Sequence, residues 1–135
     1  MKNILVFGFL IFSLGGCTSI TTMTPAQFDQ LATNQLSYVG QWSGNAGEAN
    51  STLKLNRQGS GQLCLDNYKE LMLYKVKLVN NELYSDQGVK FKVKALTQQQ
   101  AILHISLLGV GATFTLNQDD QLQQASLGCK QRMTP

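Results

Sequence analysis

The strongest constraint on the fold is a series of short runs in which apolar and polar residues alternate. The clearest run spans residues 89–95, where single lysines separate Val89, Phe91, Val93 and Ala95. Successive side chains of a β-strand point to opposite faces of the sheet, so this pattern predicts a strand with one buried face. The four apolar residues are therefore expected inside and the lysines outside.

Similar runs recur every ~8–12 residues and are separated by turns rich in Gly, Asn and Asp. The predicted strands cover residues 38–44, 51–56, 62–66, 71–79, 82–85, 89–95, 101–108, 112–116 and 121–129. Such short connections favour antiparallel neighbours, and closure of the sheet removes exposed edges. The sequence therefore predicts an all-β domain, a small up-and-down barrel or curved sheet of about eight strands. Residues 130–135 are expected to fray.

A short helix is predicted before the first strand. Thr24 can cap its N-terminus, Pro25 suits the first helical position, and Gln27 completes a capping-box pattern. We expect this helix to run from Pro25 to about Asn34. Its apolar residues Phe28 and Leu31 are expected to plug one end of the sheet, and the alternative is a helix that binds a partner.

The first residues have the pattern of a signal peptide. Met1-Lys2-Asn3 supplies a positive start, and residues 4–14 are almost entirely apolar. An apolar run of roughly ten residues is too short to cross a ~30 Å hydrocarbon layer as a helix. The alternative, a buried core segment, fits poorly with small residues and a cysteine at its end.

The end of this run, Leu14-Gly15-Gly16-Cys17, resembles the lipobox of bacterial lipoproteins. The resemblance implies cleavage before Cys17, a lipid on its thiol, and acylation of its new amino group with a fatty acid such as palmitate. Several buried acyl chains make a stable membrane anchor. Thr18 stands where an aspartate commonly retains such proteins in the inner membrane, so the resemblance implies the outer membrane and leaves its face open.

These features divide the chain into three parts. Residues 1–16 are expected to be the signal peptide, 17–24 a lipidated tether, and 25–135 a single domain. The tether is small and polar and reaches about 25 Å when extended, so the domain should lie close to the membrane. The formal net charge of +3 is too weak to argue for nucleic-acid binding.

The other two cysteines are expected to form a disulfide. With Cys17 consumed by lipid, Cys64 and Cys129 remain as a single pair in an oxidising compartment. The bond would close a loop of about 65 residues, which contributes about 4 kcal/mol in the chain-entropy model. The alternative is two buried free thiols. Together with the single His104, these cysteines do not make a zinc site.

The sequence contains no pattern that predicts catalysis. His104 lies in an apolar strand without a nearby partner that would orient a general base. Asp119 and Asp120 form part of a turn, where aspartate serves turn chemistry. We therefore expect a protein that is not an enzyme, with no catalytic residue, metal or cofactor.

The surface feature that most suggests binding is a set of outward lysines on two predicted strands. A basic face forms if these strands are neighbours, and its members are Lys75, Lys77, Lys90, Lys92 and Lys94. Such a face can meet anionic lipid headgroups, lipopolysaccharide or an acidic partner. The alternative is that the lysines only keep an exposed strand soluble and unpaired.

Two further resemblances concern the mature domain. Gly40-Gln41-Trp42 resembles the Gly-x-Trp of the first strand in lipocalin-like and avidin-like barrels, which implies that Trp42 closes the barrel base. In anchor, size and single disulfide, the chain also resembles small lipoproteins that inhibit host lysozymes, although it lacks their Ser-Gly-x-x-Tyr loop.

The sequence thus predicts an outer-membrane-anchored, non-catalytic binding module for an envelope or host protein. The alternatives are a carrier of an apolar ligand inside a lipocalin-like barrel and a structural accessory of an envelope complex.

Overall fold

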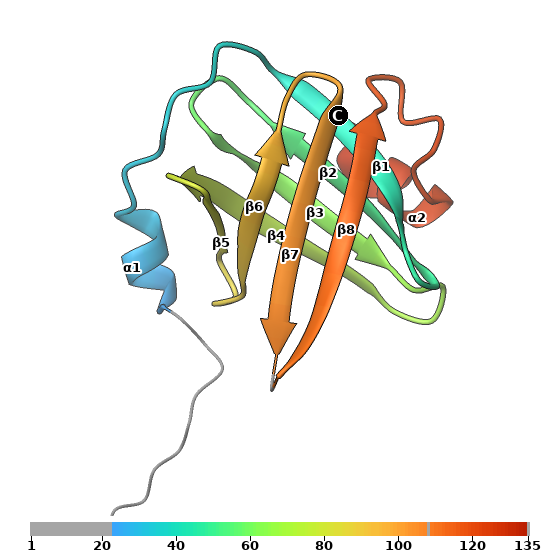
Figure 1. The fold of residues 1–135 in the computed structure, drawn as a ribbon, viewed down its shortest axis with the longest axis horizontal. Helices are drawn as coiled ribbons and strands as arrows, with labels where there is room; N and C mark the ends of the chain where they lie inside the picture. Colours follow the sequence, from blue (N-terminus) through green and yellow to red (C-terminus); the bar gives the residue numbers. More distant parts are fainter. Residues whose placement is uncertain (1–22, 108, 135) are drawn as a thin grey trace, which may run out of the picture.

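The computed structural model describes residues 23–107 and 109–134, which form a closed antiparallel barrel (Figure 1). The strands are Gly40–Ala46 (β1), Ala49–Leu55 (β2), Ser60–Asp66 (β3), Leu71–Val79 (β4), Glu82–Ser85 (β5), Lys90–Leu96 (β6), Gln100–Leu107 (β7) and Val110–Gln118 (β8). Each strand pairs with the next, and β8 pairs with β1. The all-β barrel predicted by the alternation is therefore confirmed. The proposed signal peptide and Cys17 lie outside the described residues.

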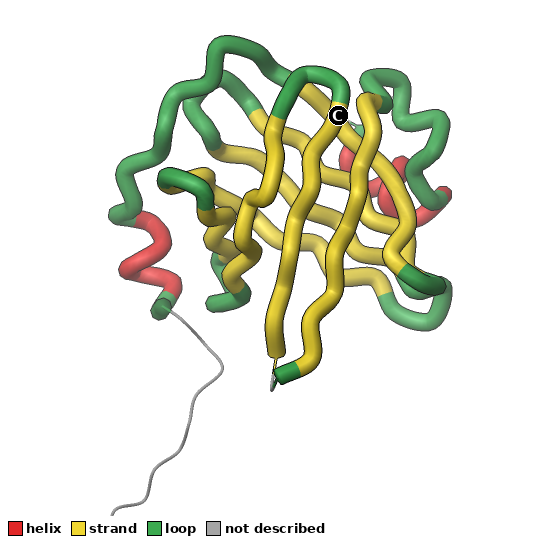
Figure 2. The backbone as a smooth tube through the Cα atoms, viewed as in Figure 1, coloured by secondary structure: helices red, strands yellow, loops and turns green. Residues whose placement is uncertain are grey.

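Two short helices lie outside the barrel wall, as Figure 2 shows in red. They are α1 (Pro25–Asp29) and α2 (Leu127–Met133). No helix among the described residues is long and apolar enough to cross a membrane.

Apolar side chains from all eight strands fill the barrel interior. The buried cluster contains Trp42, Leu53, Leu55, Leu63, Tyr74, Val76, Leu78, Leu83, Phe91, Ala101, Leu103, Phe114 and Leu116. The rings of Phe91 and Phe114 meet edge to face, with centroids 6.5 Å apart. Burial of these side chains supplies the main driving force for folding, at about 25 cal/mol per Å² of apolar surface. The predicted inward faces of the first eight strands are thus largely confirmed.

One mouth of the barrel is closed by the segment between α1 and β1. Its backbone bonds to the strand turns, with Asn34 N donating to Leu78 O at 3.0 Å and Leu36 N donating to Arg57 O at 2.7 Å. Leu36 packs against the barrel core. The hydroxyl of Tyr38 donates to Leu96 O at 2.9 Å, which holds the segment across the opening.

Trp42 lies beneath this segment, fully buried at the closed end. Its indole nitrogen lies 3.1 Å from the carbonyl oxygen of Thr97 and 3.2 Å from that of Gln98. A buried indole needs such an acceptor, so the β6–β7 turn helps to fix the ring. Trp42 therefore fills the closed end of the barrel.

The N-terminal helix differs from the prediction at its end. The capping box of Thr24 and Gln27 is present, but α1 ends at Asp29 rather than near Asn34. The chain leaves helical geometry because the backbone beyond it bonds to the barrel turns. Phe28 is buried on the outer side of β4 instead of plugging the mouth, with Lys77 Nζ 5.0 Å from its ring centroid.

The prediction of a last strand at residues 121–129 was wrong. Leu122 has a φ of 54°, which turns the chain away from the sheet, and α2 follows with Ser126 as its N-cap. Residues 130–133, expected to fray, belong to this helix, and Met133 is buried. Eight strands already close the barrel, so no edge remains for a ninth.

The predicted disulfide between Cys64 and Cys129 is confirmed, but it joins β3 to α2 rather than to a last strand. The two Cα atoms are 5.7 Å apart, within the usual range for this bond. Cys64 points outward from the barrel, opposite Leu63, and forms a second small core with Leu122, Cys129 and Met133. This core fastens the C-terminal segment to the outer wall.

The prediction that Ala95 faces the core was wrong, because β6 contains a β-bulge. The register of β6 against β7 shifts between Val93 and Ala95, so Lys94 is an extra residue on β6. Ala95 is paired with Ile102, whose neighbours Ala101 and Leu103 point inward. Ala95 therefore faces outward, and Leu96 takes its place against the core.

Replacing Cys129 with serine tests the contribution of the disulfide. Because the bond closes a long loop and holds α2, Cys129→Ser should lower the free energy of unfolding by about 2–5 kcal/mol. Urea denaturation of both proteins measures this difference. Wild-type protein in reducing agent is the control and should lose a similar amount, whereas an unchanged midpoint would contradict a stabilising bond.

Candidate binding surfaces

The structure brings the predicted basic residues together on one outer face of the barrel. We call Lys75, Lys77, Lys90, Lys92 and Lys94 the lysine strip. The short strand β5 lies between β4 and β6, with Tyr84 paired to both Lys77 and Lys90, and Glu82 paired to Lys92. The two lysine strands are therefore separated by β5, and alternation places Lys75 and Lys77 on one side of it and Lys90 and Lys92 on the other. Lys94 lies at the bulge that interrupts the alternation of β6.

Lys77 differs from the other members because it holds α1. Its Nζ donates to the carbonyl oxygens of Phe28 and Asp29, both at 3.0 Å, at the C-terminal end of the helix. The last carbonyl groups of a helix lack partners within it and carry partial negative charge, so a lysine there is stabilising. The ammonium group of Lys77 also lies over the Phe28 ring. Its role in the described structure is to attach the N-terminal segment.

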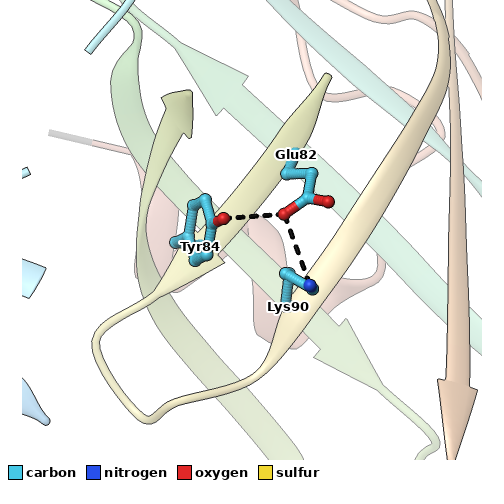
Figure 3. Close-up of polar contacts among 3 residues, drawn as sticks. All are labelled: Glu82, Tyr84 and Lys90. Carbon is cyan, nitrogen blue, oxygen red and sulfur yellow. Dashed lines mark hydrogen bonds and ion pairs between the residues drawn. The ribbon is translucent and has the colours of Figure 1, made fainter. Parts of the chain in front are cut away.

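Glu82 lies in the middle of the strip and is contacted from two sides (Figure 3). The Tyr84 hydroxyl donates to its Oε2 at 2.7 Å, and Lys90 Nζ lies 3.4 Å from the same oxygen. The hydrogen bond from Tyr84, assisted by the charges of Lys90 and Lys92, lowers the pKa of the Glu82 carboxyl. The same bond raises the pKa of the Tyr84 phenol. Glu82 is therefore an anion that neutralises part of the strip.

Three lysines of the strip keep their charge available to solvent. The side chains of Lys75, Lys92 and Lys94 are exposed, and none forms a hydrogen bond or ion pair with another described residue. The bulge on β6 lies at Lys94. Bulges often redirect a side chain, and this one places Lys94 beside a hollow lined by Tyr38 and Asn81.

A second surface, which the sequence did not indicate, is a groove on β1, β2 and β3. Three adjoining hollows of about 490, 410 and 190 Å³ share Lys54, and two of the three share Val39. We call this surface the Lys54 groove. Gln41 and Asp120 line two of the hollows, and Val39 is 53% exposed. The groove depends on the C-terminal segment lying beside β1, so the strand pattern alone could not reveal it.

His104 contacts a hydroxyl group on the neighbouring strand. Its Nδ1 lies 2.9 Å from the hydroxyl oxygen of Thr113 on the neighbouring strand, and its ring covers Gly111. Within residues 23–107 and 109–134, no three His, Cys, Asp or Glu side chains lie together in a way that could hold a metal ion. Asp119 instead accepts hydrogen bonds from the backbone of Gln123 and Gln124, which shapes the turn after β8.

The structure therefore defines a closed eight-stranded antiparallel barrel with two candidate binding surfaces on its outside. Comparisons with models of known protein families, with characterised proteins and with solved structures found no match for this chain. Its function is accordingly argued from these surfaces.

Replacing Tyr84 with phenylalanine tests the central contact of the strip. Loss of the hydroxyl should move the Glu82 pKa back up toward its ordinary value of 4.5. Because the pKa of Glu82 is lower in the folded protein than in the unfolded chain, its ionisation stabilises the folded state at pH values above the pKa of the unfolded chain. This stabilisation is lost as the pH falls through the pKa of the folded protein. An NMR titration of the Glu82 carboxyl checks the shift. An unchanged pKa in Tyr84→Phe would contradict the assigned hydrogen bond.

A matched pair of lysine variants tests the attachment of α1. Lys77→Gln should increase amide hydrogen exchange in residues 25–29, because two charge-assisted bonds to the helix end are lost. Lys75→Gln, two positions along the same strand, removes an equal charge and should leave this exchange unchanged. Equal exchange in both variants would show that Lys77 does not hold the helix.

Proposed function

We propose that this protein is a lipoprotein of the bacterial outer membrane that acts as a non-catalytic binding module for a protein partner. The lipobox-like sequence before Cys17 supports the anchor. The tether of residues 17–24 keeps the domain close to the membrane, where a partner of the envelope can meet it.

The packing of the barrel supports binding on its outer surface. Side chains from every strand fill the interior, and one mouth is closed by Leu36, Tyr38 and Trp42. Eight-stranded barrels are just wide enough either to be filled by side chains or to hold one small ligand. The observed packing favours the first possibility, so the carrier of an apolar ligand is the weaker proposal.

The observation that carries the proposal is the Lys54 groove. Its hollows meet at one half-buried lysine, and Val39 presents exposed apolar surface beside it. Apolar anchors seated in hollows beside polar groups are typical of surfaces that bind other proteins. A protein segment that lays a small apolar side chain beside Val39 and a carboxylate near Lys54 fits this surface.

Crosslinking in the native envelope, followed by mass spectrometry of proteins and extracted lipids, tests the proposal. The wild-type lipidated protein should yield one dominant crosslinked protein. Lys54→Glu and Val39→Asp should each reduce this product at least tenfold (about 1.4 kcal/mol), because they place a negative charge at the centre of the contact. Both positions have solvent access, so the fold should persist.

Tyr68→Asp is the matched control. Tyr68 is 72% exposed in the β3–β4 turn, at the mouth opposite Val39, and its replacement should leave the product unchanged. Recovery of stoichiometric lipid with no crosslinked protein would instead support the carrier. A product insensitive to both groove variants would place the partner elsewhere.

A further inference from the structure

We propose that the lysine strip rests on the anionic phospholipid headgroups of the same membrane that holds the lipid anchor. The domain then lies with the outer face of β4, β5 and β6 toward the bilayer. This inference rests on the proposed lipidation of Cys17 and adds a defined orientation to it.

The first argument is the place from which the chain leaves the domain. Lys77 of β4, a member of the strip, holds the end of α1. Figure 1 shows α1 outside the barrel, on the side of β5. The tether of residues 17–24 joins Cys17 to this helix and reaches about 25 Å at full extension. The lipid anchor therefore lies within about 25 Å of α1, which favours a membrane on the side of the barrel that carries this helix.

The second argument is the charge of that side. The five lysines of the strip are accompanied by the carboxylates of Glu82, Asp86 and, on the adjoining helix α1, Asp29, which leaves a net charge of +2. Lys75, Lys92 and Lys94 have no ionic partner among the described residues. Each lysine near an anionic leaflet raises the membrane-binding constant about fivefold, in addition to the binding that the acyl chains provide. The anchor supplies the attachment, and the strip selects which face is turned toward the lipid.

The third argument is that this orientation leaves the β1 end of the Lys54 groove accessible. In the closed order of eight strands, β1 lies four strands from β5 in either direction, so the two are on opposite sides. The groove is built on β1, β2 and β3. In a domain resting on its strip, the β1 end of the groove, at Gln41 and Asp120, therefore faces away from the bilayer. The β3 edge of the groove borders the strip, since Gln62 pairs with Lys75.

Residue-resolved labelling of lysines tests the orientation. Mature lipidated protein is reconstituted into vesicles of phosphatidylcholine, with or without phosphatidylglycerol, and treated with a water-soluble amine reagent. Peptide mass spectrometry then quantifies each lysine. We expect labelling of Lys75, Lys92 and Lys94 to be about fivefold lower on the anionic vesicles than on the neutral ones. Lys69 and Lys130, exposed on other parts of the surface, should not change, and about 0.5 M salt should restore labelling.

A pair of double variants gives the matched control. In Lys92→Gln/Lys94→Gln, the lipid-dependent protection of Lys75 and Lys90 should fall. In Lys69→Gln/Lys130→Gln, which has the same net charge, it should remain. Protection that is equal on both vesicle types, or equal at Lys69 and Lys130, would overturn the inference.

Two further outcomes separate this inference from the proposed anchor. Flotation of the vesicles measures anchoring by itself, and protein that floats but shows uniform labelling overturns the orientation alone. Protein that floats with neither vesicle overturns the anchor together with the orientation. Protection found in native envelopes but not on anionic vesicles would show that a protein covers the strip, and would also overturn the inference.

Discussion

The structure depends on the closure of the sheet, in which β1 pairs with β8. Trp42 and Ser43 are in register with Gln118 and Asn117, and Gly44 allows the strands to approach, since a Cβ there would collide with the carbonyl oxygen of Thr115. Without this pairing, both strands would present free edges and the core would open to water. Closure directs the inward residues of all eight strands into one shared core.

The outer face is in turn divided by the C-terminal segment. Ser126 donates through its hydroxyl to Asp66 at 2.6 Å and through its backbone to Asn50 at 2.8 Å, and its hydroxyl accepts from Cys129 N at 3.1 Å. With the disulfide, these bonds hold α2 over β3 and β4. The segment covers part of the wall and lines one end of the Lys54 groove, whereas the strip on β4 and β6 stays open.

Local patterns predicted most of the barrel, because period-two alternation directly reports which residues face the core. They failed where the chain departs from that period for a tertiary reason. The bulge at Lys94 adds one residue to β6 and turns the side chain of Ala95 from the core to the outer face. Nothing in the run of alternating lysines indicates this bulge. The segment 121–129 alternates weakly, yet the barrel has no free edge to pair with it. The lysine strip was predictable from two alternating strands and a short hairpin, whereas the role of Lys77 required the position of α1.

By itself the sequence determined the eight strands of the barrel, most of their inward faces and the capping box at Thr24, and it indicated the pairing of Cys64 with Cys129. These follow from residue chemistry that acts over a few positions, or from simple counting. Only the tertiary structure decided where the sheet closed, that the last segment became a helix outside it, and that Lys54, Gln41 and Asp120 lie around a common groove. The physical reason is that these features arise from contacts between residues far apart in the chain, whose free energy no local pattern contains.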